Sequence, residues 1–108
     1  MTITISGIKL DPPVFLAPMA GVTDAPSRAV AQLFDPGLVV SEMIASSEMD
    51  REYFIKKVKS SLSVNYNQKA GCPTSVQISG HQRNWLSECA KIIEIEGGAM
   101  IDINMGCP

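Results

Sequence analysis

Four short apolar runs, separated by segments with helical spacing, constrain the fold of this chain more than any other feature. Parallel strands need a crossover connection of a dozen or more residues, usually a helix, so this alternation predicts a parallel α/β sheet. A weakly alternating segment, Thr2–Leu10, precedes them and is expected to form a small hairpin over one end of the sheet. The predicted strands are Val14–Ala17, Leu38–Met43, Thr74–Gly80 and Met100–Asn104, and the predicted helices span residues 24–34, 46–59 and 82–96.

The first predicted strand and helix carry specific expectations about burial. The run Val14–Ala17 is apolar throughout, which is typical of a strand buried on both faces. Thr23 or Asp24 is suited to cap the following helix, because a short polar side chain there accepts a backbone hydrogen bond. We expect the buried side of this helix to consist of Ala29, Val30 and Leu33.

Two folds use this order of elements: an open doubly wound sheet and an eight-stranded barrel. No Gly-x-Gly-x-x-Gly motif follows the first strand, which disfavours a dinucleotide-binding sheet. Polar or special residues instead lie at the carboxyl end of every strand, as the mouth of a barrel requires: Pro18 to Gly21, Glu42, Gln77 and Asn104 to Cys107. A glutamate at such a position is unusual. We therefore predict the first half, about four βα units, of a TIM (β/α)8 barrel, with residues 1–108 an incomplete, truncated domain.

Composition excludes several other classes. The formal net charge is −2 and the sequence pI is about 5.2, so no basic surface dominates. The lysines of the segment 46–59 alternate with acids, and we favour a solvated helix face over a nucleic-acid contact. Three cysteines without a signal peptide indicate a reducing, cytoplasmic setting. No apolar run approaches the roughly 18 residues of a membrane span.

The three cysteines differ in their expected roles. Cys89 lies in mid-helix on the apolar side and is expected to be a buried hydrophobe. Cys107 sits in a Gly-Cys-Pro corner after the last strand, so its thiol is expected at the barrel mouth, where it could act as a general acid. Cys72 has the same neighbours but precedes the third strand, which assigns it to the opposite end of the sheet.

The polar residues Gln77, Asp102 and Asn104 allow two interpretations, a ligand site or a structural network. Gln77 and Asn104 offer donors and acceptors that match the edge of a heterocycle. A buried polar network with Asp102 explains them equally well. No Cys-x-x-Cys pair or Cys/His pair has metal-ligand spacing, and His81 stands alone, so no metal site is expected.

The motifs together resemble the N-terminal part of the tRNA-dihydrouridine synthases, most closely the bacterial B type. The resemblance rests on the segments Leu16–Asp24, Ser41–Met43, Val76–Ile78 and above all Asp102–Pro108, which reads Asp-Ile-Asn-Met-Gly-Cys-Pro. It covers essentially the whole chain. The family has an FMN-binding (β/α)8 barrel followed by a helical tRNA-binding domain, so the resemblance implies that this chain supplies only four strands.

Roles for individual residues follow from the resemblance. It implies that Pro18, Met19 and Ala20 lie against the isoalloxazine ring of FMN and that Gln77 contacts the flavin. It likewise places Asn104 beside the flavin and the target base, and makes Cys107 the proton donor. The family reduces FMN with NADPH and then reduces the C5=C6 bond of a uridine flipped out of the tRNA.

Two alternatives remain beside this function. One is a barrel like dihydroorotate dehydrogenase, which acts on free pyrimidines with the same cofactor. The other is a non-catalytic half-barrel that serves as a binding module. In the family, strands five to eight carry a lysine, a histidine and the flavin phosphate site, and these strands are absent here. We therefore expect residues 1–108 alone neither to hold FMN firmly nor to catalyse the reaction.

Overall fold

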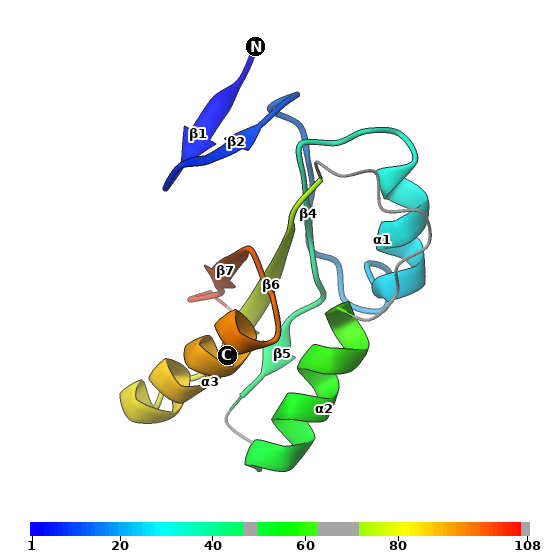
Figure 1. Ribbon diagram of the computed structural model, residues 1–108. Helices are drawn as coiled ribbons and strands as arrows, with labels where there is room; N and C mark the ends of the chain where they lie inside the picture. Colours follow the sequence, from blue (N-terminus) through cyan, green and yellow to red (C-terminus); the bar gives the residue numbers. More distant parts are fainter. Residues whose placement is uncertain (47–49, 63–71, 107–108) are drawn as a thin grey trace.

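A parallel sheet whose strands pair in chain order forms the centre of the molecule (Figure 1). The computed structural model describes residues 1–46, 50–62 and 72–106. Strand β4 lies between β3 and β6, and β7 pairs with the other edge of β6, all in parallel. These strands are β3 (Phe15–Leu16), β4 (Leu38–Val40), β6 (Thr74–Ser79) and β7 (Met100–Ile103), and the helices are α1 (Ala25–Gln32), α2 (Arg51–Leu62) and α3 (Arg83–Ile95).

This pairing confirms the predicted α/β class, the order of elements and the parallel sheet. Strands that are neighbours in the chain are also neighbours in the sheet, whereas a doubly wound sheet reverses direction at a switch point. The arrangement is therefore compatible with part of a barrel. The second helix begins later than expected, at Arg51 rather than Ser46, and ends later, at Leu62 rather than Lys59.

The predicted strand Leu38–Met43 is broken in the structure. It ends at Val40, and a short strand, β5 (Ile44–Ala45), resumes pairing on the same side of β6. Val40 pairs with Ser75, and Ile44 pairs with Ile78. Between these two pairs β6 advances by three residues and the neighbouring segment by four, so the neighbouring segment contains one extra residue. The extra residue is a bulge of the kind that re-aims side chains next to functional sites. It lies at the segment 41–43, which includes Glu42.

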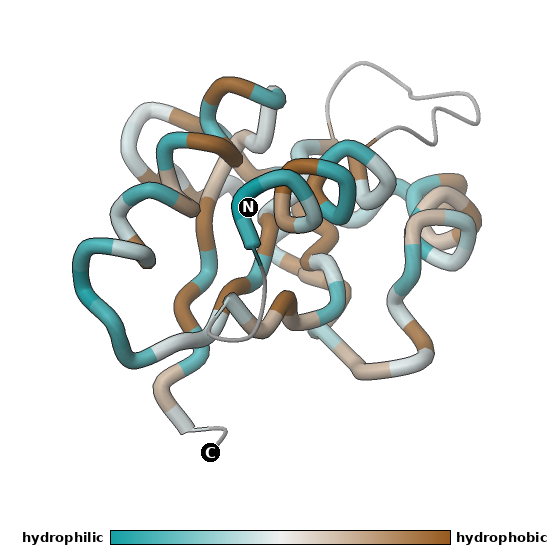
Figure 2. Tube along the Cα trace, turned by 90° about the horizontal axis from the view of Figure 1, so that it is seen from below, coloured by the Kyte–Doolittle hydropathy of each residue, from teal (hydrophilic) through white to brown (hydrophobic). Residues whose placement is uncertain are grey.

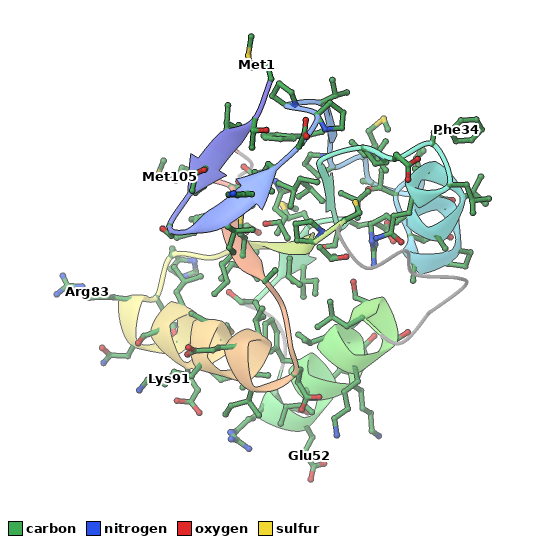
Figure 3. All side chains as sticks on the ribbon, turned by 45° about the horizontal axis from the view of Figure 1, so that its top comes forward. Met1, Phe34, Glu52, Arg83, Lys91 and Met105 are labelled. Carbon is green, nitrogen blue, oxygen red and sulfur yellow. The ribbon has the colours of Figure 1, made fainter. Side chains whose placement is uncertain are left out.

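The larger core lies between the sheet and the helices α2 and α3. Phe54 and Val58 of α2 are fully buried there, and the rings of Phe54 and Trp85 meet edge to face with centroids 5.9 Å apart. Cys89 is fully buried in the same core, as predicted. In Figure 2 the chain alternates repeatedly between hydrophobic and hydrophilic colouring. Each helix has a buried and an open face, whereas β4 and β6 are buried almost throughout. Glu52 and Lys91 point away from the sheet (Figure 3).

The N-terminal hairpin covers the end of the sheet at which the strands begin. It consists of β1 (Ile3–Ile5) and β2 (Ile8–Leu10), paired antiparallel. Leu10 is fully buried against Leu38 and Val40, with Met100 packed beside them. Figure 1 shows the hairpin at the top, where β4 starts, which confirms the predicted cover over one end.

Two burial predictions are wrong. The strand β3 was expected to be buried on both faces, but it lies at the edge of the sheet, and Val14 and Phe15 are exposed. On α1 only Ala29 of the three expected residues is buried, whereas Val30 is 58% and Leu33 59% exposed. Periodicity identifies a helix but not the direction from which its neighbours pack. Phe34, just after α1, is 82% exposed and points outward (Figure 3).

Candidate active site at the carboxyl ends of the strands

Gln77 and Asp102 meet across the neighbouring strands β6 and β7, of which β7 lies at the edge of the sheet. They are register partners on β6 and β7, and Gln77 donates a hydrogen bond from Nε2 to Oδ2 of Asp102. Gln77 is only 7% exposed, whereas Asp102 is half-buried. A carboxylate can only accept, so the amide must turn its NH2 group toward Asp102. The Gln77–Asp102 part of the predicted polar network is therefore present, whereas the Asn104 side chain accepts from Gly106.

Asn104 lies directly after β7 and shapes the exit of the chain from the sheet. Its backbone N–H donates to the carbonyl oxygen of Ile78 at 2.9 Å, which continues the ladder by one residue. Its side-chain Oδ1 accepts from the backbone N–H of Gly106 at 2.9 Å, a local turn that asparagine favours. Cys107, the predicted proton donor, lies outside the described residues.

The loop that contains Pro18, Met19 and Ala20 is closed on itself at the same end of the sheet. The Met19 carbonyl oxygen accepts from the backbone N–H groups of Val22 and Thr23 at 3.0 and 2.9 Å. The Met19 N–H in turn donates to Oγ1 of Thr23 at 2.9 Å. Both main-chain groups of Met19 are thus used within the loop, so this residue offers a flat ligand a packing surface. Met19 and Ala20 are exposed and Pro18 is half-buried.

Glu42 connects this loop to the sheet. Its Oε2 accepts from the backbone N–H of Gly21 at 2.8 Å, although the two residues lie 21 positions apart in the chain. Gly21 has a φ of +73°, a conformation that glycine adopts without strain. Sequence reasoning noted that a glutamate at this strand end is unusual but did not include Glu42 among the candidate site residues.

Arg28 is a second contact that sequence reasoning missed. It is buried on α1 and donates from Nη1 to the carbonyl oxygen of Thr23 at 2.5 Å and from Nη2 to Ser61 of α2. Burial lowers the pKa of the Arg28 guanidinium, and the nearby carboxylates of Glu42 and Asp24 oppose that shift. The hydropathy pattern of a helix assigns an arginine to the exposed face, so it could not reveal that Arg28 is buried.

A cavity of about 380 Å³ lies beside these residues, between the start of α1 and the end of α2. Glu42, Arg28, Lys57 and Ser61 are among the residues that line it. Gln77 and Asn104 are not, so the cavity is separate from the cluster of predicted site residues. Its lining mixes acidic and basic side chains.

The structure describes two cysteines, Cys72 in the segment before β6 and Cys89 in α3. Cys72 precedes β6, and its carbonyl oxygen accepts from Nε2 of Gln32 at 3.3 Å, which places it at the amino end as predicted. Burial raises the pKa of the Cys72 thiol, and burial raises that of Cys89 to about 11. A thiol with a raised pKa stays protonated at neutral pH and is a poor nucleophile.

Three cationic side chains of α2 lie near a carboxylate or an aromatic ring. Arg51 lies 3.4 Å from Glu88, and Lys59 lies 3.9 Å from Glu96. The Lys57 ammonium lies 6.0 Å from the centre of the Tyr53 ring.

Residues 1–46, 50–62 and 72–106 contain neither a metal-binding cluster nor a membrane-spanning helix. No group of three or more His, Cys, Asp or Glu side chains there could hold a metal ion. No helix in those ranges is long and apolar enough to cross a membrane.

Comparison with known proteins identifies the family. The model of the dihydrouridine synthase (Dus) family matches residues 15–108. A probable tRNA-dihydrouridine synthase of Rhodobacter capsulatus is 48% identical over 108 residues, which cover 100% of this chain and 32% of that protein. The tRNA-dihydrouridine synthase B proteins of Xanthomonas axonopodis pv. citri and Pasteurella multocida are 42% and 38% identical, each over 96% of this chain and 30% of the relative. No solved structure matches.

The chain thus spans about a third of the length of the curated relatives that it matches. With the family model covering residues 15–108 and relatives aligned along nearly the whole sequence, the chain belongs to the dihydrouridine synthase family.

Proposed function

We propose that residues 1–108 form the N-terminal part of the catalytic barrel of an FMN-dependent tRNA-dihydrouridine synthase. The whole protein would reduce the C5=C6 bond of specific uridines in tRNA to 5,6-dihydrouridine with NADPH as the reductant. Family membership supports the reaction, and strand pairing in chain order supports the barrel. Because its substrate is tRNA, we place the protein in the cytoplasm.

The observation that carries this proposal is the convergence of the loop 18–21 and Gln77 at one end of the sheet. Glu42 accepts from Gly21, and Ser41 Oγ accepts from the backbone N–H of Gln77 at 3.0 Å. Two neighbouring residues of the bulge therefore join the loop to the middle strand. Hydrogen bonds of this chain therefore link the two predicted flavin contacts, the loop and Gln77.

The residues present fit FMN. An exposed segment of small and apolar residues, Pro18 to Ala20, offers a surface for a flat ring. The Gln77 amide, turned by Asp102, offers polar atoms for the edge of a heterocycle. When bound and reduced by NADPH, the flavin would supply the hydride that adds to C6 of the uracil. Residues for the flavin phosphate and for NADPH are expected outside this chain.

The side chains of this chain would provide binding and the proton. Asn104 would hold the edge of the flipped uracil through its amide. Cys107 would donate the proton from Sγ to C5, since a cysteine with an ordinary pKa of about 8.5 is mostly protonated at neutral pH. The hydride at C6 and the proton at C5 together saturate the double bond and leave the thiolate to be reprotonated from solvent.

A fusion protein tests this function directly. Residues 1–108 would be joined to the remaining two thirds of the Rhodobacter capsulatus relative. All 108 residues of this chain match that relative, over 32% of the relative's length. Dihydrouridine would be measured by mass spectrometry in tRNA from a strain that lacks its own synthases. We expect Cys107→Ala to abolish the product and Cys72→Ala to retain it. Unchanged product in Cys107→Ala, or loss in Cys72→Ala alone, would contradict the assignment.

The same fusion separates the alternatives. A barrel that acts on free pyrimidines would oxidise dihydroorotate and leave tRNA unmodified, and no observation in the structure favours it. A non-catalytic module would give neither product. Residues 1–108 alone are expected to bind FMN too weakly for a yellow, stoichiometric complex, so isolation of such a complex would refute that expectation.

A further inference from the structure

The loop from Pro18 to Thr23 has a shape of its own but depends on other residues for its place on the sheet. Its internal hydrogen bonds run from Val22 and Thr23 back to the Met19 carbonyl oxygen, and from Met19 to the Thr23 hydroxyl. These bonds close the loop locally. They do not determine how far it stands from β4 and β6.

Two side chains of opposite charge hold the loop from outside. The Glu42 carboxylate accepts from the Gly21 N–H at 2.8 Å, and the Arg28 guanidinium donates to the Thr23 carbonyl oxygen at 2.5 Å. Glu42 comes from the bulge after β4, whereas Arg28 comes from α1. Arg28 binds the loop to the start of α1, so of these two side chains it is Glu42 that links the loop to the strands β4 and β6.

Glu42 is itself held in place through its neighbour. Ser41 is buried, donates from Oγ to the Glu42 carbonyl oxygen at 3.0 Å and accepts from the Gln77 N–H. With the Gln77 bond to Asp102, hydrogen bonds run continuously from the loop after β3 to β7. The bulge makes this possible, because an unbroken strand would use backbone groups alone for pairing with β6.

We propose that Glu42 is a positioning residue for the cofactor site: its carboxylate holds Gly21 and thereby sets the depth at which the segment 18–20 meets the ring. This inference rests on the proposed function, since the ring is that of the flavin. Glu42 acts on the ligand only through the loop. Its effect should therefore follow the ability of the side chain to accept a hydrogen bond and not its charge.

The test uses two variants of Glu42 and one control in the fusion protein. Glu42→Ala removes the acceptor, whereas Glu42→Gln keeps an oxygen of the same reach and removes the charge. Glu88→Ala is the control. It also removes a carboxylate that accepts a hydrogen bond, in this case from Arg51, but Glu88 lies on α3 and does not contact the loop. The readouts are the FMN dissociation constant from flavin fluorescence and hydrogen exchange of a peptide that contains Gly21, with circular dichroism to verify folding.

We expect Glu42→Ala to raise the FMN dissociation constant about tenfold and to speed exchange in the Gly21 peptide, since the loss of one hydrogen bond of about 1.4 kcal/mol corresponds to a factor of ten. Glu42→Gln should stay within about threefold of the parent, and Glu88→Ala should match the parent. Unchanged binding and exchange in Glu42→Ala would overturn the proposal. So would a Glu42→Gln variant as impaired as Glu42→Ala, because charge rather than positioning would then be responsible.

The same experiment distinguishes failure of the proposed flavin function from failure of the Glu42 positioning role. A folded parent fusion that binds no FMN would refute the flavin site. Exchange at Gly21 would still report on the Glu42 contact, because it requires no ligand.

Discussion

Replacement of Asp102 by alanine should destabilise the folded chain by about 2 kcal/mol. The change leaves the Gln77 Nε2 group without its acceptor, and Gln77 is only 7% exposed, so water cannot readily replace the lost partner. A buried donor left unsatisfied costs about 1–3 kcal/mol. Asp102 is half-buried and its truncation removes little apolar packing, so most of the loss should come from the amide.

The assay is urea unfolding followed by far-UV circular dichroism. With an m-value of about 2 kcal/mol/M, the midpoint of Asp102→Ala should fall by about 1 M. Asp102→Asn keeps an acceptor oxygen and should lose less than half as much.

A double-mutant cycle isolates the contact. Gln77→Met replaces the amide with an apolar group of similar length, so the double variant with Asp102→Ala leaves no orphaned donor. The two changes together should cost about 1 kcal/mol less than the sum of the single changes. Additive costs, or an Asp102→Ala variant as stable as the parent, would refute the proposed role of this pair.

Three further predictions concern stability and reactivity. Phe54→Ala should cost about 3–5 kcal/mol in urea unfolding because the ring is fully buried, whereas the matched Phe34→Ala should cost almost nothing. Hydrogen bonds from the first turn of α1 lower the pKa of Asp24. Its contribution to stability is therefore present above the unfolded pKa of about 4 and is lost as pH falls through the lower folded value, so the gap between parent and Asp24→Ala should close in acid. Cys89 should resist alkylation at about pH 8 until the chain unfolds, and rapid alkylation of the folded chain would contradict its burial.

The order of strands and helices could be predicted from the sequence because each element has its own local signal. Apolar runs and three- or four-residue spacing are properties of single segments, so β6 and α3 were placed within one or two residues of their observed bounds. The family motifs further identified Pro18, Gln77 and Asn104 as candidate site residues. The structure brings the loop of Pro18 and Gln77 into one hydrogen-bonded network.

Features that depend on two partners could not be predicted in this way. The break after Val40 exists because β6 advances one residue fewer, and that mismatch appears only when the strands are paired. The burial of Arg28 depends on carbonyl oxygens of Thr23 and Ser61, which lie 5 and 33 positions away in the chain. The exposure of Val30 on α1 likewise depends on which side of the helix has neighbours.

The central claim is that the carboxyl ends of these strands form one site for a flavin and a uracil. A crystal structure of the fusion protein with FMN tests it most directly. We predict that the flavin ring lies against Pro18–Ala20, with the side chains of Gln77, Asn104 and Cys107 all at its edge or face. A flavin bound elsewhere, or a Cys107 thiol at the opposite end of the sheet from Gln77, would contradict the account.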